Sequence, residues 1–472
     1  MIAFNTLADD VLLIIFDFYL DEDEQRIGQW KTLAHVCRRW RSVVFQSPHR
    51  LHLQLRCTPK TPARDGLSDW PPLPLIVSVG IYDKERSMDN VIAALEHNDR
   101  VCQIKFDCFA NSPDSPFECI TNSAAMQKPF PELTHLNIVV WNGNPILPNS
   151  FLGRTAPRLQ SLKLDGVPFP GLEKLLLSAT HLVKLDLHRI SRSGSILPET
   201  MATSLSVLTR LEILRLRFRD SRTRSAVVES RRPPPPLITR PILPSLTKIK
   251  FEGDSEYLEE ILARIDAPRL IDLHVTFLDH DIFDAPQLFQ FISRRSTLRA
   301  SEKGYIALNS RTIFVKFPSQ TSDHGVLSVE MERKDEMRTS RDEICHSHGI
   351  SGLENLYTFE ERGYLPQRQD NVENSPWLDL LRLFVDVKNL YLSKEFVPRI
   401  APALQLALVR GRTTEVLPTL ENIFLEQLKP LGPLGPIKKF AAARRLTNHP
   451  VAVSRWSNDP ENQMIRLNFY NL

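Results

Sequence analysis

The sequence offers few side chains whose type and spacing fit metal binding. Cys345, His346 and His348 stand close together, and each is a residue type that binds zinc. A tetrahedral zinc site needs four ligands, and this highly charged stretch supplies no fourth one nearby. The six cysteines contain no CxxC pair, so they are interpreted as reduced, structural thiols. These residues therefore predict no metal site and no cofactor.

Motifs of the common enzyme classes are missing as well. The chain holds no P-loop, GxGxxG, GxSxG or HExxH sequence. With 13 histidines and 56 acidic residues, some titratable side chains fall near each other by chance, so no acid–base pair can be defended. We therefore expect a binding protein rather than an enzyme.

One segment is exceptional in charge. Between Arg210 and Arg240 there are nine arginines and three acids, together with the proline run Pro233–Pro236. One interpretation is a solvated loop inserted between structured elements. The alternatives are a nuclear localisation signal or a docking site for an acidic or phosphorylated protein, because arginine forks pair with carboxylate and phosphate. Nucleic-acid binding is disfavoured because no aromatic platform for stacking bases accompanies the arginines.

Length and composition indicate a folded chain with more than one part. At 472 residues it exceeds the usual single domain, which points to several domains or one extended repeat array. A net charge of +3 implies neither nucleic acid nor membrane by itself. Thirty-five prolines against 17 glycines favour short elements separated by rigid corners. No apolar run approaches the ~18–20 residues that span a bilayer, so we expect a cytoplasmic and/or nuclear protein without a membrane segment.

The first fifty residues predict two amphipathic helices. Apolar residues recur at helical spacing over 7–16, and a second apolar stripe covers 30–44. Ser47, followed by proline, is expected to end the second helix. A hairpin this short is near the lower size limit for a self-sufficient core. We therefore expect it to bury apolar surface against a partner.

The same segment resembles the F-box over about positions 5–50. The family pattern opens with Leu-Pro, continues through an Ile-Phe pair and ends with a Val-Cys-x-x-Trp-Arg core; Ala8 stands here in place of the proline. The matching residues are Leu7, Ile15, Phe16, Val36, Cys37, Trp40 and Arg41. The resemblance implies binding to the Skp adaptor of a cullin-based ubiquitin ligase, and a plain hairpin capping the next domain is the alternative. The residues expected to contact the adaptor are Leu7, Ala8, Val11, Leu12, Ile15, Phe16, Leu33, Val36, Cys37 and Trp40.

A Leu-x-x-Leu-x-Leu pattern recurs through the rest of the chain. Its nine copies begin at Val101, Leu133, Leu159, Leu182, Leu211, Leu246, Leu270, Val387 and Leu420. From 133 to 270 successive copies lie 23 to 35 residues apart, near the ~20–29 residues of a leucine-rich repeat. Helical stripes lie between the copies, and a proline stands two residues ahead of several of them. A strand–helix unit of this size cannot bury its apolar faces alone, so neighbouring units are expected to stack.

We therefore predict an α/β protein: a short N-terminal helical F-box followed by a leucine-rich repeat-like solenoid, with a curved parallel sheet backed by helices. The predicted parts are an F-box module at 1–56, a solenoid at 73–446 and a C-terminal tail or cap at 447–472. The rhythm weakens at about 293–357, where irregular repeats and an inserted loop are both compatible with the pattern. The order of segments resembles fungal F-box proteins with degenerate leucine-rich repeats. This resemblance implies a non-catalytic substrate receptor of an SCF-type ubiquitin ligase, joined through the adaptor to a cullin; a repeat scaffold acting outside a ligase is the alternative.

The alternation within the copies also predicts which strand residues face outward. In each copy the last two apolar residues are two apart and point into the core, so the residues between and beside them lie on the opposite face. These outward positions are largely polar, and we expect them to bind an acidic or phosphorylated target; polarity that merely keeps the sheet soluble is the alternative. They are His135, Asn137, Lys163, Asp165, Lys184, Asp186, His188, Arg215, Arg217, Lys248, Lys250, Glu252, Asp272 and His274. The predicted basic centre is Lys184, Arg215, Arg217, Lys248 and Lys250.

Overall fold

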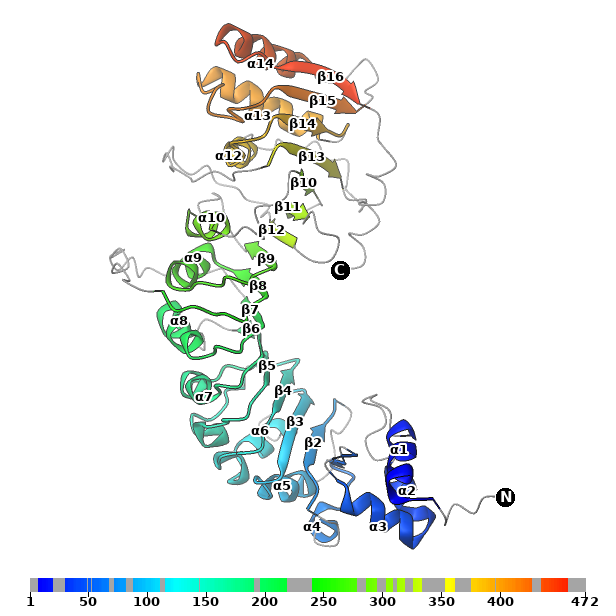
Figure 1. Cartoon of the computed structure of the whole chain (residues 1–472). Helices are drawn as coiled ribbons and strands as arrows, with labels where there is room; N and C mark the ends of the chain where they lie inside the picture. Colours follow the sequence, from blue (N-terminus) through cyan, green and yellow to red (C-terminus); the bar gives the residue numbers. More distant parts are fainter. Residues whose placement is uncertain are drawn as a thin grey trace. The chain divides into compact units, whose positions relative to one another are not determined.

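The protein is an α/β molecule, as predicted, made of short helices and a parallel sheet (Figure 1). It divides into two compact units, Met1–Leu211 and Glu212–Leu472. The computed structural model describes residues 7–19, 30–48, 50–51, 53–67, 72–81, 88–110, 115–143, 145–190, 196–218, 240–277, 286–294, 303–308, 312–318, 326–332, 353–360, 375–394, 396–426 and 434–456.

Three short helices open the first unit: α1 (Asp9–Tyr19), α2 (Trp30–Val36) and α3 (Arg38–Gln46). The stripe predicted as one second helix is in fact two helices, because Cys37 has an extended backbone and caps α3. Its Sγ accepts a hydrogen bond of 3.4 Å from the backbone N–H of Trp40. Ser47 follows the last residue of α3, where the sequence predicted the helix to end.

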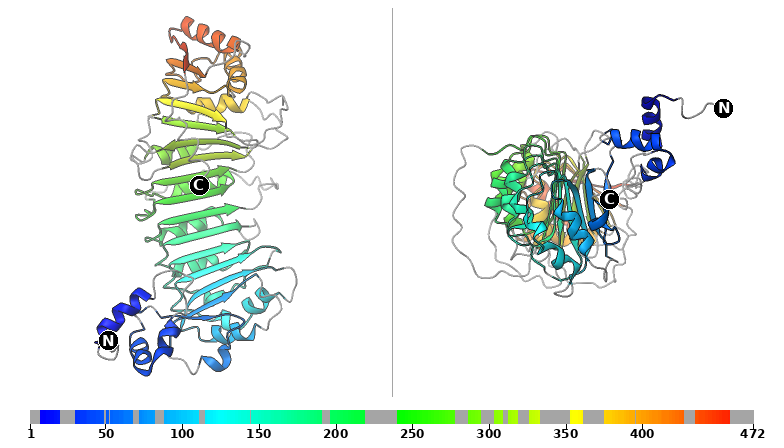
Figure 2. Two further views of the ribbon diagram at one scale, coloured as in Figure 1. Left: turned by 90° about the vertical axis from the view of Figure 1, so that its right-hand side faces the viewer. Right: turned by 90° about the horizontal axis from the view of Figure 1, so that it is seen from below.

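The rest of the first unit is a parallel sheet with helices on one face (Figure 2). Its strands are β1 (Leu55–Cys57), β2 (Leu75–Val79), β3 (Val101–Cys108), β4 (His135–Val140), β5 (Ser161–Asp165) and β6 (Lys184–Ile190). The helical segments are α4 (Ala63–Gly66), α5 (Asp89–Glu96), α6 (Pro116–Thr121), η3 (Ala125–Gln127), η4 (Phe151–Arg154), α7 (Leu172–Ser178) and α8 (Pro198–Ser206). Neighbouring strands pair in chain order, and a helical segment returns the chain between them, as parallel pairing requires.

The second unit repeats this plan. Its strands are β7 (Ile213–Phe218), β8 (Lys248–Gly253), β9 (Asp272–Phe277), β10 (Lys303–Leu308), β11 (Thr312–Pro318), β12 (Val326–Glu332), β13 (Asn355–Glu360), β14 (Asn389–Leu392), β15 (Asn422–Glu426) and β16 (Ala452–Trp456). Its helices are α9 (Ser255–Arg264), α10 (Pro286–Ser293), α12 (Ser375–Arg382), α13 (Val397–Val409) and α14 (Leu434–Leu446). Strand β16 pairs with β15, so the sheet continues past the end predicted at 446.

The irregular stretch predicted at about 293–357 contains an antiparallel meander. Strand β11 pairs antiparallel with both β10 and β12, while β12 pairs parallel with β9 and β10 pairs parallel with β13. The order across this part of the sheet is therefore β9-β12-β11-β10-β13. The sequences of β11 and β12 alternate as strands do, but alternation carries no information on strand direction.

Each copy of the repeat pattern contains a strand, and its leucines form the core. The two strand residues of each copy that point inward are no more than 6% exposed. Examples are Leu162 and Leu164 in β5, and Leu214 and Leu216 in β7. The prolines ahead of the copies occupy tight turns: Leu159 N–H, for instance, donates to Ala156 O across Pro157 at 3.1 Å. Proline suits the second position of such a turn because its φ is already fixed.

Candidate functional site

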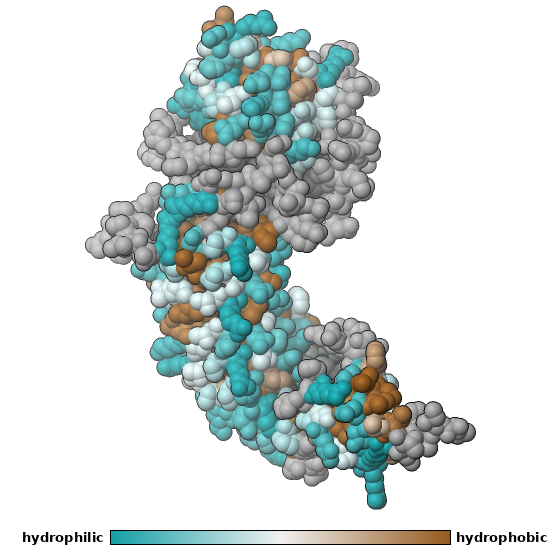
Figure 3. Space-filling model, in the orientation of Figure 1, coloured by the Kyte–Doolittle hydropathy of each residue, from teal (hydrophilic) through white to brown (hydrophobic). Residues whose placement is uncertain are grey.

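An apolar patch is exposed on the α1–α3 module, where Figure 3 shows apolar residues gathered on the surface. The module patch is defined by Val11, Ile14, Ile15, Phe18, Tyr19 and Val36. Phe18 is 82% exposed and Val36 is 56% exposed. Six large apolar side chains on two short helices exceed the scattered single residues of an ordinary surface, and such a patch is typical of a protein-interaction site.

Specific side-chain contacts hold together helices α1 and α3 of the module that carries the patch. The Phe16 and Trp40 rings meet edge to face with centroids 4.8 Å apart, which packs α1 on α3. Arg39 joins the same two helices: its guanidinium donates to Asp9 Oδ1 at 2.6 Å and also to the carbonyl of Leu7. These contacts fix the module, so that an approaching partner would meet an already ordered apolar surface.

The residues predicted to contact an adaptor divide into three groups. Leu12, Phe16 and Leu33 are at most 5% exposed and form the core of the module instead of its surface. Leu7, Cys37 and Trp40 are half-buried. The exposed members are Ala8, Val11, Ile15 and Val36. The prediction missed Ile14, Phe18 and Tyr19, which the helical period of α1 places beside the exposed members.

The outward positions of the sheet lie where alternation predicted them. Parallel register aligns them in rows across each unit. In the first unit one row runs Lys105, Asn137, Lys163 and Asp186 from β3 to β6. In the second unit a comparable row runs Arg215, Lys250 and His274 from β7 to β9. The remaining predicted positions, all but one at least partly exposed, are His135, Lys184, His188, Arg217, Lys248, Glu252 and Asp272, with the buried Asp165 as the exception.

Carboxylates neutralise part of the predicted basic centre. Arg217 forms an ion pair with Glu252 at 2.6 Å, and Lys248 forms one with Asp272 at 3.2 Å. Both cations lie in the second unit, and each ion pair has no net charge. Lys184, which completes the predicted centre, belongs to the first unit.

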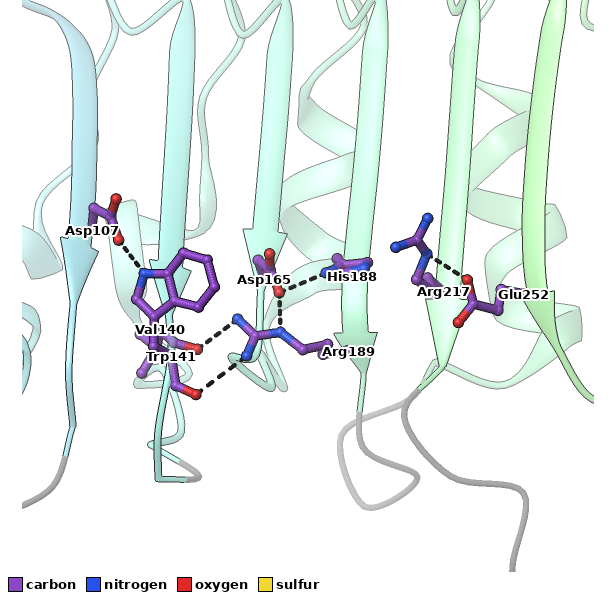
Figure 4. A network of polar contacts seen from close by, with 8 residues as sticks. All are labelled: Asp107, Val140, Trp141, Asp165, His188, Arg189, Arg217 and Glu252. Atoms are coloured by element: carbon purple, nitrogen blue, oxygen red, sulfur yellow. Dashed lines mark hydrogen bonds and ion pairs between the residues drawn. The ribbon is translucent and has the colours of Figure 1, made fainter. Parts of the chain in front are cut away.

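Asp165 lies on the predicted outward face, but its predicted exposure needs a correction, because this aspartate is only 7% exposed. Its Oδ1 accepts hydrogen bonds from His188 Nδ1 at 2.8 Å and from Arg189 Nε at 2.5 Å (Figure 4). Burial by itself raises the pKa of this carboxyl, but the hydrogen bonds and positive charge of His188 and Arg189 outweigh it and hold the pKa below its usual range. The aspartate is therefore ionised at neutral pH and fixes both neighbours.

Arg189 connects this buried aspartate to an exposed tryptophan. Its guanidinium also donates to the carbonyls of Val140 at 2.8 Å and Trp141 at 3.3 Å, and it lies 5.5 Å from the centroid of the Trp141 ring. The indole Nε1 of Trp141 donates to Asp107 Oδ1 at 2.6 Å (Figure 4). We call these residues the strand-end cluster: Asp107, Trp141, Asp165, His188 and Arg189.

The backbone around the strand-end cluster is unusual in two places. Arg189 has a φ of +50°, a conformation that costs energy for a residue with a side chain. Gly166 has a φ of +73°, and an added Cβ would lie 2.5 Å from the Val140 carbonyl oxygen. Glycine is required there, since it alone allows β5 to end this close to β4.

The second unit carries an aromatic ladder that the sequence prediction did not identify. Tyr305, Tyr357, Tyr391 and Phe424 stack on successive strands with centroids 5.3, 4.3 and 4.6 Å apart. Trp456 meets Tyr391 edge to face at 5.5 Å. The repeat pattern contained part of the signal, since Tyr391 in β14 and Phe424 in β15 each stand between the last two apolar residues of a copy. The ring faces are occupied by one another, so the ladder is a packing feature of the sheet.

Other sequence candidates lie outside the described residues. They include Cys345, His346 and His348, and five arginines of the charged stretch: Arg219, Arg222, Arg224, Arg231 and Arg232. The described part of the chain brings together no group of three or more side chains suited to holding a metal ion. Among the helices of that part, none has the length and apolar character needed to cross a bilayer.

Comparison of the chain with protein-family models and with curated proteins finds no match. The functional interpretation therefore depends on the module patch, the sheet face and the strand-end cluster.

Proposed function

We propose that this protein is a non-catalytic substrate receptor of an SCF-type ubiquitin ligase. In this proposal the α1–α3 module is an F-box that binds the Skp adaptor, and through it a cullin. The strand–helix units form a leucine-rich repeat-like solenoid whose sheet face binds the target. Ubiquitin transfer then gains rate because the target is held near the conjugating enzyme.

The observation that carries the proposal is the module patch. A self-contained hairpin would bury its largest apolar side chains, yet Ile15, Phe18 and Val36 are between 39% and 82% exposed. Burial of such side chains at an interface is worth roughly 1.5–3 kcal/mol each when complete. The patch is therefore suited to a largely apolar interface with a partner protein, which agrees with the F-box resemblance of this segment.

Co-purification with the adaptor tests the proposal. The full chain would be co-expressed with a tagged Skp adaptor and a cullin, as the native protein and as the double variant Ile15→Asp, Phe18→Asp. Two buried carboxylates at the interface should weaken capture by about 100-fold or more. The matched control is Leu177→Asp on α7, which changes another exposed apolar side chain (41%) and should leave capture unchanged.

The two outcomes that count against the proposal are distinct. Equal capture of the native chain and the double variant would show that the module patch is not the adaptor interface. Capture of the adaptor without any cullin would favour the alternative, a repeat scaffold acting outside a ligase. Circular dichroism of each variant checks that the helices remain folded.

A further inference from the structure

The sheet face of the first unit carries a set of lysines without ion pairs. Within the described residues, Lys105, Lys163 and Lys184 form no salt bridge. Lys105 and Lys163 flank Asn137 in one row, on strands β3, β4 and β5. Two strand spacings separate these two lysines by about 10 Å. We call Lys105, Asn137 and Lys163 the lysine row.

The carboxylates beside the lysine row are already engaged. Asp107 accepts the indole N–H of Trp141, and Asp165 is held by His188 and Arg189. Asp186 stands at the register position next to Lys163. On the outward face of β3 to β6, four cations (Lys105, Lys163, Lys184 and Arg189) stand against three carboxylates (Asp107, Asp165 and Asp186), so positive charge is in excess by one.

A fixed aromatic side chain lies beyond the same face. Trp141 is 48% exposed, although its indole is held at one edge by Asp107 and on its ring by Arg189. An exposed tryptophan that is already ordered loses little conformational freedom on binding. Tryptophan is also among the residues that most often dominate the binding energy of protein interfaces.

From these three observations we propose that the lysine row and Trp141 form a docking surface for an acidic peptide segment that carries an apolar residue. The inference rests on the proposed function for its biological meaning, since it gives the chemistry of the target that the receptor would hold. The lysines bind the carboxylates of the peptide, and the ring of Trp141 packs against its apolar side chain.

Carboxylates fit this surface better than a phosphate group. Phosphopeptide sites are usually built from arginine forks, and Arg189, which lies against the Trp141 ring, already donates from all three of its nitrogens to Asp165 and two carbonyl oxygens. Lysines about 10 Å apart match separated acidic side chains more easily than one compact phosphate. Trp141 directly follows β4 and lies four residues beyond Asn137, a distance of about 13 Å along an extended chain. The apolar residue is thus expected about four residues from the acids.

The probe is a library of fluorescein-labelled dodecapeptides with a fixed Asp-Glu pair and one apolar residue placed two to six residues away. A second library replaces the acids with serine and a third with phosphoserine. Binding to the full chain is measured by fluorescence anisotropy at two salt concentrations. We expect the acidic library to bind, with the strongest signal near a four-residue spacing and with weaker binding in high salt.

Variants locate the binding site. Lys105→Glu, Lys163→Glu should weaken binding by about tenfold or more, and so should Trp141→Ala. The matched controls are Lys174→Glu, an exposed lysine on α7, and Leu177→Ala on the same helix, which should bind as the native chain does. Trp141→Phe keeps an aromatic ring and should retain part of the affinity, which separates a lost contact from a lost fold.

Several outcomes would overturn the inference. These are binding of the acidic library that is unaffected by the lysine and tryptophan variants, equal binding of the serine library, and exclusive binding of the phosphoserine library. Adaptor capture by the same variants is measured in parallel and should be unchanged. Peptide binding without adaptor capture would refute the proposed function and leave this docking surface standing.

Discussion

The pair formed by Asp165 and Arg189 offers a direct test of the strand-end cluster. Arg189→Met keeps an unbranched apolar stem but leaves a carboxylate whose side chain is 10% exposed, with His188 as its remaining side-chain partner. Removing one member of a fully buried ion pair costs about 3–5 kcal/mol. Arg189 is 25% exposed and His188 stays in place, so we expect a loss of about 2–3 kcal/mol in the free energy of unfolding.

The second variant of this test removes the charge. Asp165→Asn takes away the ionised carboxylate, so that Arg189→Met no longer strands a buried charge in the double variant. The two losses should therefore not add: the double variant should be about 1–2 kcal/mol more stable than the sum of the single effects predicts. Guanidinium unfolding of the four proteins, followed by circular dichroism, measures this coupling.

A matched pair in the same unit controls for arginine loss in general. Arg158 and Glu132 form an ion pair whose side chains are 62% and 43% exposed. Solvent screens such a pair, so Arg158→Met should change stability by less than about 1 kcal/mol. Strictly additive effects at Asp165 and Arg189, or equal losses for Arg158→Met and Arg189→Met, would refute the account of the cluster given above.

Three further predictions concern pH, backbone conformation and thiol reactivity. Because the pKa of Asp165 is lowered in the folded state, its ionised carboxylate stabilises the protein fully above the unfolded pKa of about 3.9, and this stabilisation is lost as pH falls through the folded pKa. Urea unfolding from pH 7 to 3 measures the stability difference between the native chain and Asp165→Asn. This difference should shrink as the pH falls below about 3.9. Gly166→Ala should cost about 2–4 kcal/mol because a carbonyl oxygen lies 2.5 Å from the new Cβ, whereas Gly411→Ala, with φ +66° and open space, should cost only about 1 kcal/mol; thermal melts compare the two. Burial raises the pKa of Cys102 to about 11, so mass spectrometry after iodoacetamide treatment at pH 8 should find the exposed Cys119 modified well before Cys102; equal rates would contradict this.

Much of the sheet was predictable because its information is local. The Leu-x-x-Leu-x-Leu copies place inward residues two apart, and each strand needs only its own sequence to show that alternation. The turn prolines are equally local, since Pro157 acts within its own four-residue turn. By contrast, the helix break at Cys37 was not predictable. It lies inside an unbroken apolar stripe, and a thiol at a cap position does not change the helical periodicity of the sequence.

The strand-end cluster was not predictable for the opposite reason. Trp141 reaches Asp107, which is 34 residues earlier, and Arg189 reaches Val140, which is 49 residues earlier. No short motif records such pairings. Alternation placed Asp165 on the outward face correctly, but the neighbouring strand supplies His188 and Arg189, the two side chains that cover it. The direction of β11 could not be predicted either, because side chains alternate with a period of two in both antiparallel and parallel strands.

The β10–β12 meander has a consequence for how this sheet can change in length. Three antiparallel strands reverse direction twice, so β12 and β10 both run in the sense of the parallel strands that they join. Removal of the hairpin formed by β11 and β12 would leave β10 between β9 and β13, which is the arrangement of an ordinary repeat. Any even number of added strands preserves this polarity, whereas an odd number would turn every later strand around. The meander is thus a place where the chain can gain whole two-stranded hairpins. Such an insertion leaves the direction and the register of the repeats that follow unchanged.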